Sequence, residues 1–154
     1  QYPKFGSNFW LKFLSPNLRS WSRVSPTVNC STDGVQALCK SSQLVEGGKG
    51  LRFVVSAFQG KYSAFVVRHR SGLSAFLNIC AHMDLELDWV AGRFFDSEGH
   101  HLICSTHGAL YDPVSGLCVK GPCRGAYLKP VAVRESSDQV FLADPSFVLM
   151  SIEL

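Results

Sequence analysis

Two short cysteine–histidine pairs constrain this chain of 154 residues more than any other feature of its sequence. The first pair is Cys80-Ala81-His82 and the second is Cys104-Ser105-Thr106-His107, with residues 83–103 between them. Each pair directly follows a short apolar run typical of a β-strand, at residues 75–79 and 102–103. A metal site needs its ligands on loops that rigid elements hold in place. The sequence therefore predicts two strand-anchored loops that converge on a metal.

The four side chains offer two thiolates and two imidazoles, and two kinds of metal centre accept such a set. Zinc is bound tetrahedrally by two Cys and two His, but the usual zinc sequence places both Cys in one segment and both His in the other. Here each segment holds one of each. Mixed pairs suit two irons, one bound by both Cys and the other by both His. This pattern resembles the Rieske iron-sulfur family, whose signature is Cys-x-His followed by Cys-x-x-His.

The resemblance extends beyond the ligands, over roughly residues 36–144. Residues 78–82 are similar to the first cluster-binding loop of the family, residues 104–112 to the second, and residues 115–118 with Gly121-Pro122 to the closing turn and the proline loop that shields the cluster. In the family the His ligands lie at the tip of the domain, where electrons leave. The resemblance implies a Rieske-type [2Fe-2S] cluster, with Cys80, His82, Cys104 and His107 as metal ligands and Ala109, Tyr111 and Pro122 beside it.

Departures from the respiratory-chain branch of this family indicate which branch the chain resembles. That branch carries one extra Cys in each cluster loop, and the two form a disulfide; the matching positions here are Leu85 and Thr106. Its serine that donates a hydrogen bond to the cluster is replaced by Ala109, whereas its tyrosine is present as Tyr111. Hydrogen bonds to sulfur raise the reduction potential. The chain therefore resembles the ferredoxin and oxygenase branch without the disulfide, with a potential near the lower end of the family's range.

The residues around these motifs form short β-prone runs separated by turn signals. The predicted fold class is all-β, a Rieske-type antiparallel β sandwich or barrel with a small cluster-binding subdomain of two loops plus a proline loop. Strands are expected at residues 35–39, 51–57, 62–68, 73–78, 101–103, 117–119, 129–133 and 140–143, with a turn at 136–138. The predicted organisation is an N-terminal extension at 1–35, the Rieske domain at 36–144, and a tail at 145–154 in which residues 147–152 form a last strand or pack as a tail.

Charge and composition exclude several classes of partner. The net charge of +3 comes from the first 39 residues, since acidic and basic side chains balance from Lys40 onward. Nucleic-acid binding requires a dense basic face on the folded part, so no nucleic-acid partner is expected. No apolar run reaches the roughly 20 residues of a membrane span. Six cysteines are too few for a scaffold built on disulfides, so the cysteines beside histidines are expected to bind metal in a reducing compartment. No secretory leader is recognisable, so the expected compartment is the cytoplasm.

The resemblance implies a function in electron transfer rather than an enzyme. The expected protein is a monomeric single-electron carrier that receives electrons from a reductase and passes them to a terminal enzyme such as an oxygenase. The alternative is a small Rieske subunit of a multi-subunit reductase, resembling the small chain of assimilatory nitrite reductase. A structural zinc module is a third hypothesis.

Other residues with chemical potential receive simpler interpretations. Cys118 and Cys123 flank the proline loop and are either two small buried residues or a disulfide or redox-active pair. His69, His100 and His101 are expected at solvated positions. The loop between the ligand pairs is acidic and is either merely solvated or able to steer a basic partner. Its acidic residues are Asp84, Glu86, Asp88, Asp96 and Glu98.

Overall fold

The computed structural model describes residues 36–153, and the predictions for residues 1–35 lie outside them. The described residues contain one 3₁₀ turn at Ser41–Gln43 and no α-helix, which confirms the all-β class. Within this range no helix is long and apolar enough to cross a bilayer. The strands are β1 (Ala37–Lys40), β2 (Leu51–Ala57), β3 (Gly60–His69), β4 (Gly72–Leu77), β5 (Leu102–Ile103), β6 (Leu110–Tyr111), β7 (Cys118–Lys120), β8 (Val133–Ser136), β9 (Gln139–Leu142) and β10 (Val148–Glu153).

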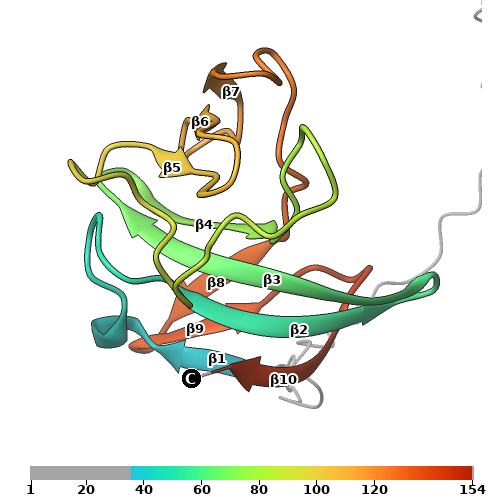
Figure 1. Cartoon of the computed structure of the whole chain (residues 1–154). Coiled ribbons are helices and arrows are strands. Elements are labelled where there is room, and N and C mark those ends of the chain that lie inside the picture. Colours follow the sequence, from blue (N-terminus) through green and yellow to red (C-terminus); the bar gives the residue numbers. More distant parts are fainter. Residues whose placement is uncertain (1–35, 154) are drawn as a thin grey trace, which may run out of the picture. The chain divides into compact units, whose positions relative to one another are not determined.

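The strands form three antiparallel sheets. The central sheet has the order β10-β2-β3-β4, a second sheet has the order β1-β9-β8, and a small sheet has the order β5-β6-β7. Figure 1 shows the small sheet on one side of the central sheet and the β1-β9-β8 sheet on the other side. The central sheet is therefore covered on both faces, and the small sheet carries the predicted cluster-binding subdomain.

Strand β3 explains how one sheet supports both neighbours. Residues Ala64, Phe65, Val66 and Val67 are all fully buried, as expected for a strand with no solvent face. Because successive side chains point to opposite faces, Phe65 and Val67 pack toward the small sheet, whereas Ala64 and Val66 pack with the core beside β9. The continuous apolar run in the sequence is the signature of this double burial.

The prediction of a strand at residues 129–133 was wrong. Lys129 accepts a hydrogen bond from the Leu77 N–H at 2.9 Å, and Val131 donates one to the Ala75 carbonyl at 2.9 Å, but Pro130 between them has no N–H to extend a ladder. The strand begins at Val133 instead and pairs with β9. Strand β8 is largely exposed, so it lacks the apolar alternation that reveals a strand.

Two connections complete the sandwich. Ser137 and Asp138 have positive φ values of 50° and 61°, the conformation of a two-residue turn that joins β8 to β9 at the predicted position. At the end of the chain, residues Val148–Glu153 form β10, which pairs with β2 along the edge of the central sheet. Of the two alternatives for residues 147–152, the structure has the strand. A register shift between Leu149 and Ser151 interrupts this pairing.

Candidate metal centre

The two predicted ligand loops follow strands of different sheets. Cys80 lies three residues beyond the end of β4 in the central sheet, and Cys104 directly follows β5 in the small sheet. The loops are tied to each other by the Ser105 N–H, which donates to the Leu87 carbonyl at 2.7 Å. The packing of the small sheet against the central sheet therefore brings together two segments that lie apart in the sequence.

Three of the four predicted ligands form one compact group. The ligand atoms of Cys80, Cys104 and His107 all lie within 4.8 Å of one another. The Nδ1 atom of His107 is 3.7 Å from the Cys80 Sγ and 3.6 Å from the Cys104 Sγ. His82 lies outside this group, but its ring meets the His107 ring edge to face, with the ring centroids 4.5 Å apart.

The group has a buried sulfur side and an accessible imidazole side. Cys80 is 2% exposed and Cys104 is fully buried, and both belong to the core between the central and small sheets. His107 is partly exposed and His82 is exposed. Sulfurs inside and imidazoles outside are the order that two differently ligated metal ions would require, with one ion shielded and the other close to the surface.

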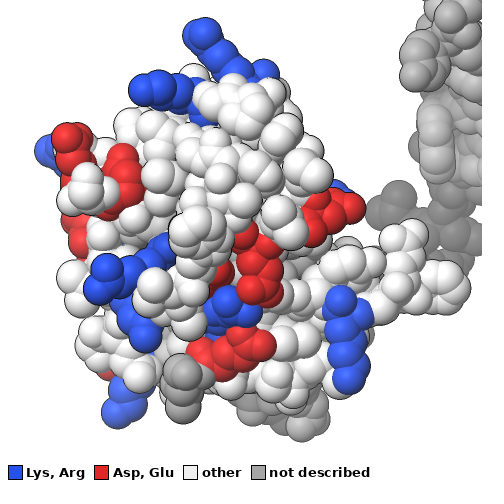
Figure 2. Space-filling view, viewed as in Figure 1, with Lys and Arg blue, Asp and Glu red and all other residues white. Residues whose placement is uncertain are grey.

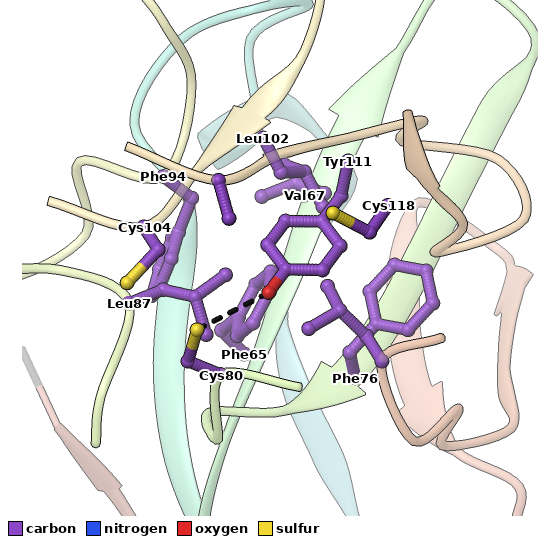
Figure 3. Close-up of a cluster of buried hydrophobic side chains, with 12 residues drawn as sticks. Phe65, Val67, Phe76, Cys80, Leu87, Phe94, Leu102, Cys104, Tyr111 and Cys118 are labelled. Carbon is purple, nitrogen blue, oxygen red and sulfur yellow. Dashed lines mark hydrogen bonds between the residues drawn. The ribbon is translucent and has the colours of Figure 1, made fainter. Parts of the chain in front are cut away.

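Tyr111 lies behind the first sulfur. Its hydroxyl is 3.2 Å from the Cys80 Sγ and accepts a hydrogen bond from the Ala81 N–H at 3.2 Å (Figure 3). The side chain is fully buried among Phe65, Phe76 and Leu102. Burial and the hydrogen bonds to sulfur raise the pKa of Tyr111, so the hydroxyl stays protonated and can donate to Cys80.

The two thiols differ in acidity. Burial would raise the pKa of Cys80, but hydrogen bonds from the Tyr111 hydroxyl, the His82 backbone and His107 outweigh it and lower this pKa to about 7. Burial raises the pKa of Cys104, and the neighbouring Cys80 sulfur adds to that effect. Since the thiolate is the form that binds a metal, Cys80 is the sulfur that reaches it at the lower pH.

A tight turn shapes the second ligand loop. The Gly108 N–H donates to the Cys104 carbonyl at 2.8 Å, and the Cys104 N–H donates to the Ala109 carbonyl at 2.9 Å. Gly108 has a φ of 64°, in the left-handed region that glycine occupies without strain. This turn places His107 back over Cys104, which explains why a glycine directly follows the second histidine.

The proline loop packs against the same turn. A Cβ atom at Gly121 would lie 2.7 Å from the Ala109 Cα, so only glycine allows this approach of two backbones. Ala109 is fully buried beneath the loop, whereas Pro122 is exposed. Of the three residues predicted beside the ligands, Ala109 and Tyr111 therefore lie in the core and Pro122 lies on the outer side of the loop.

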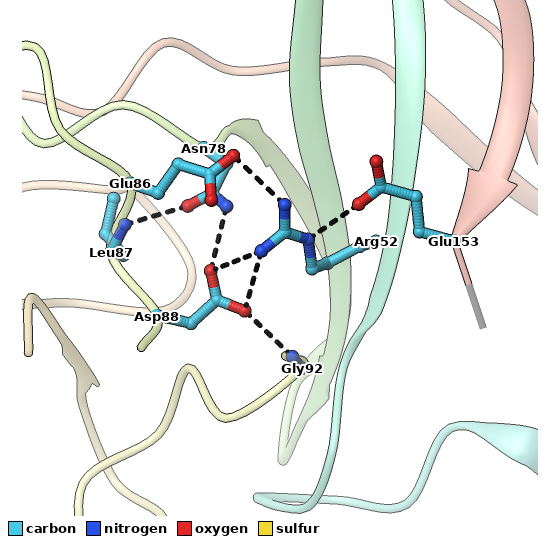
Figure 4. A network of polar contacts seen from close by, with 7 residues as sticks. All are labelled: Arg52, Asn78, Glu86, Leu87, Asp88, Gly92 and Glu153. Atoms are coloured by element: carbon cyan, nitrogen blue, oxygen red, sulfur yellow. Dashed lines mark hydrogen bonds and ion pairs between the residues drawn. The ribbon is translucent and has the colours of Figure 1, made fainter. Parts of the chain in front are cut away.

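The first ligand loop is fixed by a buried carboxylate that the sequence analysis did not single out. Asp88 accepts hydrogen bonds from the Asn78 side chain at 2.9 Å and from the Gly92 N–H at 2.8 Å (Figure 4). Arg52 on β2 binds Asp88 at 3.2 Å and also pairs with Glu86. The one signal in the sequence was a charged residue among apolar neighbours, Leu87 and Trp89.

This network also bears on the acidic loop. Arg52 pairs with Glu86, Asp88 and Glu153, and Asp88 is nearly fully buried. Asp96 and Glu98 lie beside His101 and His100, respectively. The acidic residues of the loop therefore do not form one continuous charged surface. Figure 2 shows acidic and basic side chains interspersed on the visible face. Both interpretations of the loop, a merely solvated segment and one that steers a basic partner, stay predictions.

The prediction for His69 was wrong, because this residue is 7% exposed rather than solvated. Its Nδ1 accepts the Ser71 N–H at 3.2 Å, and its Nε2 lies 2.9 Å from the Ser74 hydroxyl. Burial lowers the pKa of His69, although Asp112 and Glu46 partly oppose this shift. The two hydrogen bonds satisfy both nitrogens of the neutral ring.

No disulfide links the two ligand loops. Thr106 instead accepts a hydrogen bond from the Trp89 Nε1 at 3.0 Å, which joins the second ligand loop to the segment that follows the first. All five cysteines in the described part of the chain are free thiols: Cys39, Cys80, Cys104, Cys118 and Cys123.

Comparisons with known proteins agree with this architecture. The ferredoxin of Sphingomonas yanoikuyae B1 aligns with a TM-score of 0.53 at 19% identity, over 73% of this chain and 100% of its own. The ferredoxin of carbazole 1,9a-dioxygenase from Nocardioides aromaticivorans IC177 aligns with a TM-score of 0.52 at 22% identity, over 73% of this chain and 99% of its own. These identities show a shared fold. No curated protein sequence matches the chain significantly.

A terminal oxygenase contains the same fold as one part of a larger chain. The oxygenase of carbazole 1,9a-dioxygenase from the same Nocardioides strain aligns with a TM-score of 0.52 at 18% identity, over 77% of this chain and 30% of its own. The profile of the Rieske [2Fe-2S] domain matches residues 34–138, which is more than half of the chain. Two buried sulfurs beside imidazole nitrogen form a donor set that suits this cofactor. The chain therefore belongs to the Rieske [2Fe-2S] domain family.

Proposed function

We propose that this protein is a single-electron carrier whose cluster is held by Cys80 and Cys104 on the inner iron and by His82 and His107 on the outer iron. The observation that carries the proposal is the convergence of Cys80, Cys104 and His107 within 4.8 Å at the junction of two sheets. A [2Fe-2S] cluster bound there accepts and releases one electron at a time. His82 lies against His107 and completes the set on the exposed side.

The exposed imidazoles are the proposed exit for the electron. Met83 directly follows His82 and Leu85 lies two residues further on; they are 54% and 45% exposed, which leaves apolar side chains near the outer ligand. Exposed apolar side chains favour docking of a protein partner, whereas the buried sulfurs stay out of its reach. The partner is thus expected to contact the histidine side of the centre.

The expected partners are a reductase as donor and a terminal oxygenase as acceptor, and the protein itself converts no substrate. Two of the aligned structures are ferredoxins by name, and a third is a complex of reduced oxygenase with oxidised ferredoxin in carbazole 1,9a-dioxygenase. We place the carrier in the cytoplasm, because the free thiols of the described residues suit a reducing compartment. A monomer is the expected oligomeric state.

The test is to purify the full chain anaerobically and to measure iron, acid-labile sulfide and zinc. We expect equal iron and sulfide, a red-brown colour, and a rhombic EPR signal of low average g after reduction with dithionite. Cys80→Ala should lose the cluster, whereas Cys39→Ala, at a free cysteine on β1, should retain it. Colourless zinc-loaded protein would identify a structural zinc module, and iron without sulfide would exclude a Rieske cluster.

Partner class is tested separately with the loaded protein. The reduced carrier should be reoxidised rapidly in stopped-flow mixing with a terminal oxygenase of its own organism, and it should elute as a monomer in gel filtration. Isolation from its native source in a stable complex with a larger reductase would instead identify a permanent subunit.

A further inference from the structure

Cys118 and Cys123 bring two thiols together behind the metal centre. Cys118 begins β7 and Cys123 lies in the loop after it, and their Sγ atoms are 3.2 Å apart. A disulfide bond is about 2.05 Å long, so a movement of about 1 Å would join them. Neither thiol belongs to the proposed ligand set, and both are free.

The backbone holds the two thiols in register. The Gly125 N–H donates to the Cys118 carbonyl at 2.9 Å, and the Cys118 N–H donates to the Ala126 carbonyl at 2.8 Å. The Ala126 N–H donates in turn to the Cys123 carbonyl at 2.9 Å. These bonds close the loop as a compact hairpin and hold the two cysteine backbones close enough for their sulfurs to meet.

The two thiols differ in exposure. Cys118 is 1% exposed, whereas Cys123 is partly exposed and follows the exposed Pro122. Burial and the neighbouring Cys123 raise the pKa of Cys118 to about 11. An attacking thiol must be accessible to the reagent, so the partly exposed Cys123 is suited to react first and the buried Cys118 to complete the bond.

The surroundings of the pair are cationic. Lys120 and Arg124 lie on either side of the loop and are both exposed. In Figure 2, Lys and Arg side chains occupy the upper edge of the view, where Figure 1 places β7. A positive surface raises the local concentration of an anionic reagent. A small anionic disulfide such as oxidised glutathione fits this site better than a neutral one.

The pair also contacts the residue that binds the first ligand. The Cys123 Sγ is 3.2 Å from the Tyr111 hydroxyl, which is itself 3.2 Å from the Cys80 Sγ. The Cys123 thiol donates its one hydrogen to the Cys118 Sγ, so the Cys123 sulfur faces the Tyr111 hydroxyl as an acceptor. Cys123 and Cys80 therefore compete for the single hydroxyl hydrogen of Tyr111. A disulfide draws the Cys123 sulfur toward Cys118 and leaves this hydrogen to Cys80.

We propose that Cys118 and Cys123 form a reversible disulfide by exchange with oxidised glutathione, and that this bond strengthens the hydrogen bond from Tyr111 to Cys80. The first part stands on the loop geometry alone, and the second rests on the proposed function. The Cys123 thiolate breaks the glutathione disulfide and releases one glutathione, which takes the Cys123 proton. Cys118 then displaces the second glutathione, which takes the Cys118 proton. The protein dithiol is oxidised, and the glutathione disulfide is reduced to free thiols.

The disulfide can be detected directly, because trypsin cleaves after Lys120, between the two cysteines. Holoprotein is equilibrated in buffers of increasing oxidised-to-reduced glutathione ratio, quenched in acid, alkylated, and digested. We expect the peptide ending at Lys120 to become linked to the peptide of residues 121–124, and to separate again in excess reduced glutathione. Cys118→Ala and Cys123→Ser should abolish the linked species, and Cys39→Ser should not.

The effect on the centre is read from the same samples by voltammetry and EPR. Wild-type protein with the disulfide should have a higher cluster potential than wild-type protein with free thiols, whereas Cys123→Ser, which lacks the thiol that reacts first, should show no response to glutathione. Unlinked peptides at every ratio, or a stable glutathione adduct on Cys123, would overturn the disulfide. A linked species with unchanged potential would overturn the action through Tyr111. Loss of the proposed function would appear separately, as protein that never contained iron and sulfide.

Discussion

At the scale of single residues, Tyr111 is the clearest determinant of the electronic properties of the centre. Its hydroxyl is fully buried and 3.2 Å from the Cys80 Sγ. Ala109 is fully buried and carries no hydroxyl, and in the described core Tyr111 is the hydroxyl in contact with this sulfur. A hydrogen bond to sulfur favours the reduced, more negative cluster.

We therefore expect Tyr111→Phe to lower the reduction potential. A net hydrogen bond of about 1 kcal/mol corresponds to about 40 mV for a one-electron couple. Protein-film voltammetry measures this shift directly. Tyr127→Phe is the matched control, because Tyr127 is 60% exposed and should leave the potential unchanged. Equal potentials in wild-type and Tyr111→Phe would show that the hydroxyl does not donate to the ligand.

His69 makes stability depend on pH in a definite direction. Burial lowers its pKa, so the folded state binds the proton less readily than the unfolded chain, whose histidine pKa is about 6.5. Stability should therefore decrease as the pH falls below about 6.5. Protonation of Nδ1 would also remove the acceptor of the Ser71 N–H.

The measurement is the melting temperature between pH 7.5 and pH 5. His69→Gln should have a lower melting temperature than wild-type at pH 7.5, but its melting temperature should fall less between pH 7.5 and pH 5. The pKa values of Asp96 and Asp112 are lowered, so these carboxylates stay ionised in the folded state and affect stability only below about pH 4. Parallel melting curves for both proteins across this range would show that His69 is not the titrating group.

At the scale of elements, the proline loop is held against the second ligand loop by the contact between Gly121 and Ala109. Gly121 and Gly125 both have positive φ values, 114° and 91°, so alanine is strained at either position. Only at Gly121 would the added Cβ meet another backbone, whereas nothing lies within 4 Å at Gly125. Comparing alanine substitutions at these two glycines therefore separates the effect of the contact between the loops from the effect of backbone strain.

Gly121→Ala should displace the loop and expose the centre. We expect the cluster of this variant to be lost several-fold faster than that of Gly125→Ala when an iron chelator is added, as followed by visible absorbance. Overpacking of this kind costs about 1–3 kcal/mol. Equal rates of loss in the two variants would mean that the proline loop does not protect the cluster.

The first ligand loop depends on its anchor to β2. Asp88 accepts hydrogen bonds from Asn78 and Gly92 and pairs with Arg52 (Figure 4). Asp88→Ala should lower the free energy of unfolding by about 3 kcal/mol, because it leaves buried donors unsatisfied. Glu153→Gln is the control: this carboxylate binds Arg52 at the surface and should change stability by less than about 1 kcal/mol. Urea unfolding of both variants gives the comparison.

These elements also show what a sequence can and cannot predict. Strand β2 was predicted with its observed bounds and β3 within two residues, because their apolar runs are set by burial. Strand β8 is exposed and is defined by pairing with β9, which leaves no hydrophobic period to read. The ligand loops were found from the spacing of Cys and His. The contact between Asp88 and Arg52 was not predicted from the sequence, because contacts between distant segments are set by the tertiary fold.

At the scale of the described domain, the central sheet separates two cores of different kinds. The core toward the β1-β9-β8 sheet includes Phe53, Val55 and Val140 and contains none of the proposed ligands. The core toward the small sheet includes both Cys80 and Cys104. The small sheet itself has strands of only two or three residues, so its ladders contribute few hydrogen bonds. The ligand-bearing part of the domain should therefore lose more of its local stability when the metal is removed.

Removal of the metal should consequently loosen one part of the domain and spare the other. Metal binding is linked to the folding of the loops that supply the ligands, and local stability can differ between such units. After iron is chelated, amides in residues 78–125 should exchange with deuterium at least about tenfold faster, a loss of about 1.4 kcal/mol or more. Amides of Leu51–Ala57 in β2 should keep their protection, because their core is complete without a ligand. Hydrogen exchange followed by mass spectrometry resolves both regions in one experiment, and a uniform loss of protection would show instead that both cores fold as a single unit around the metal.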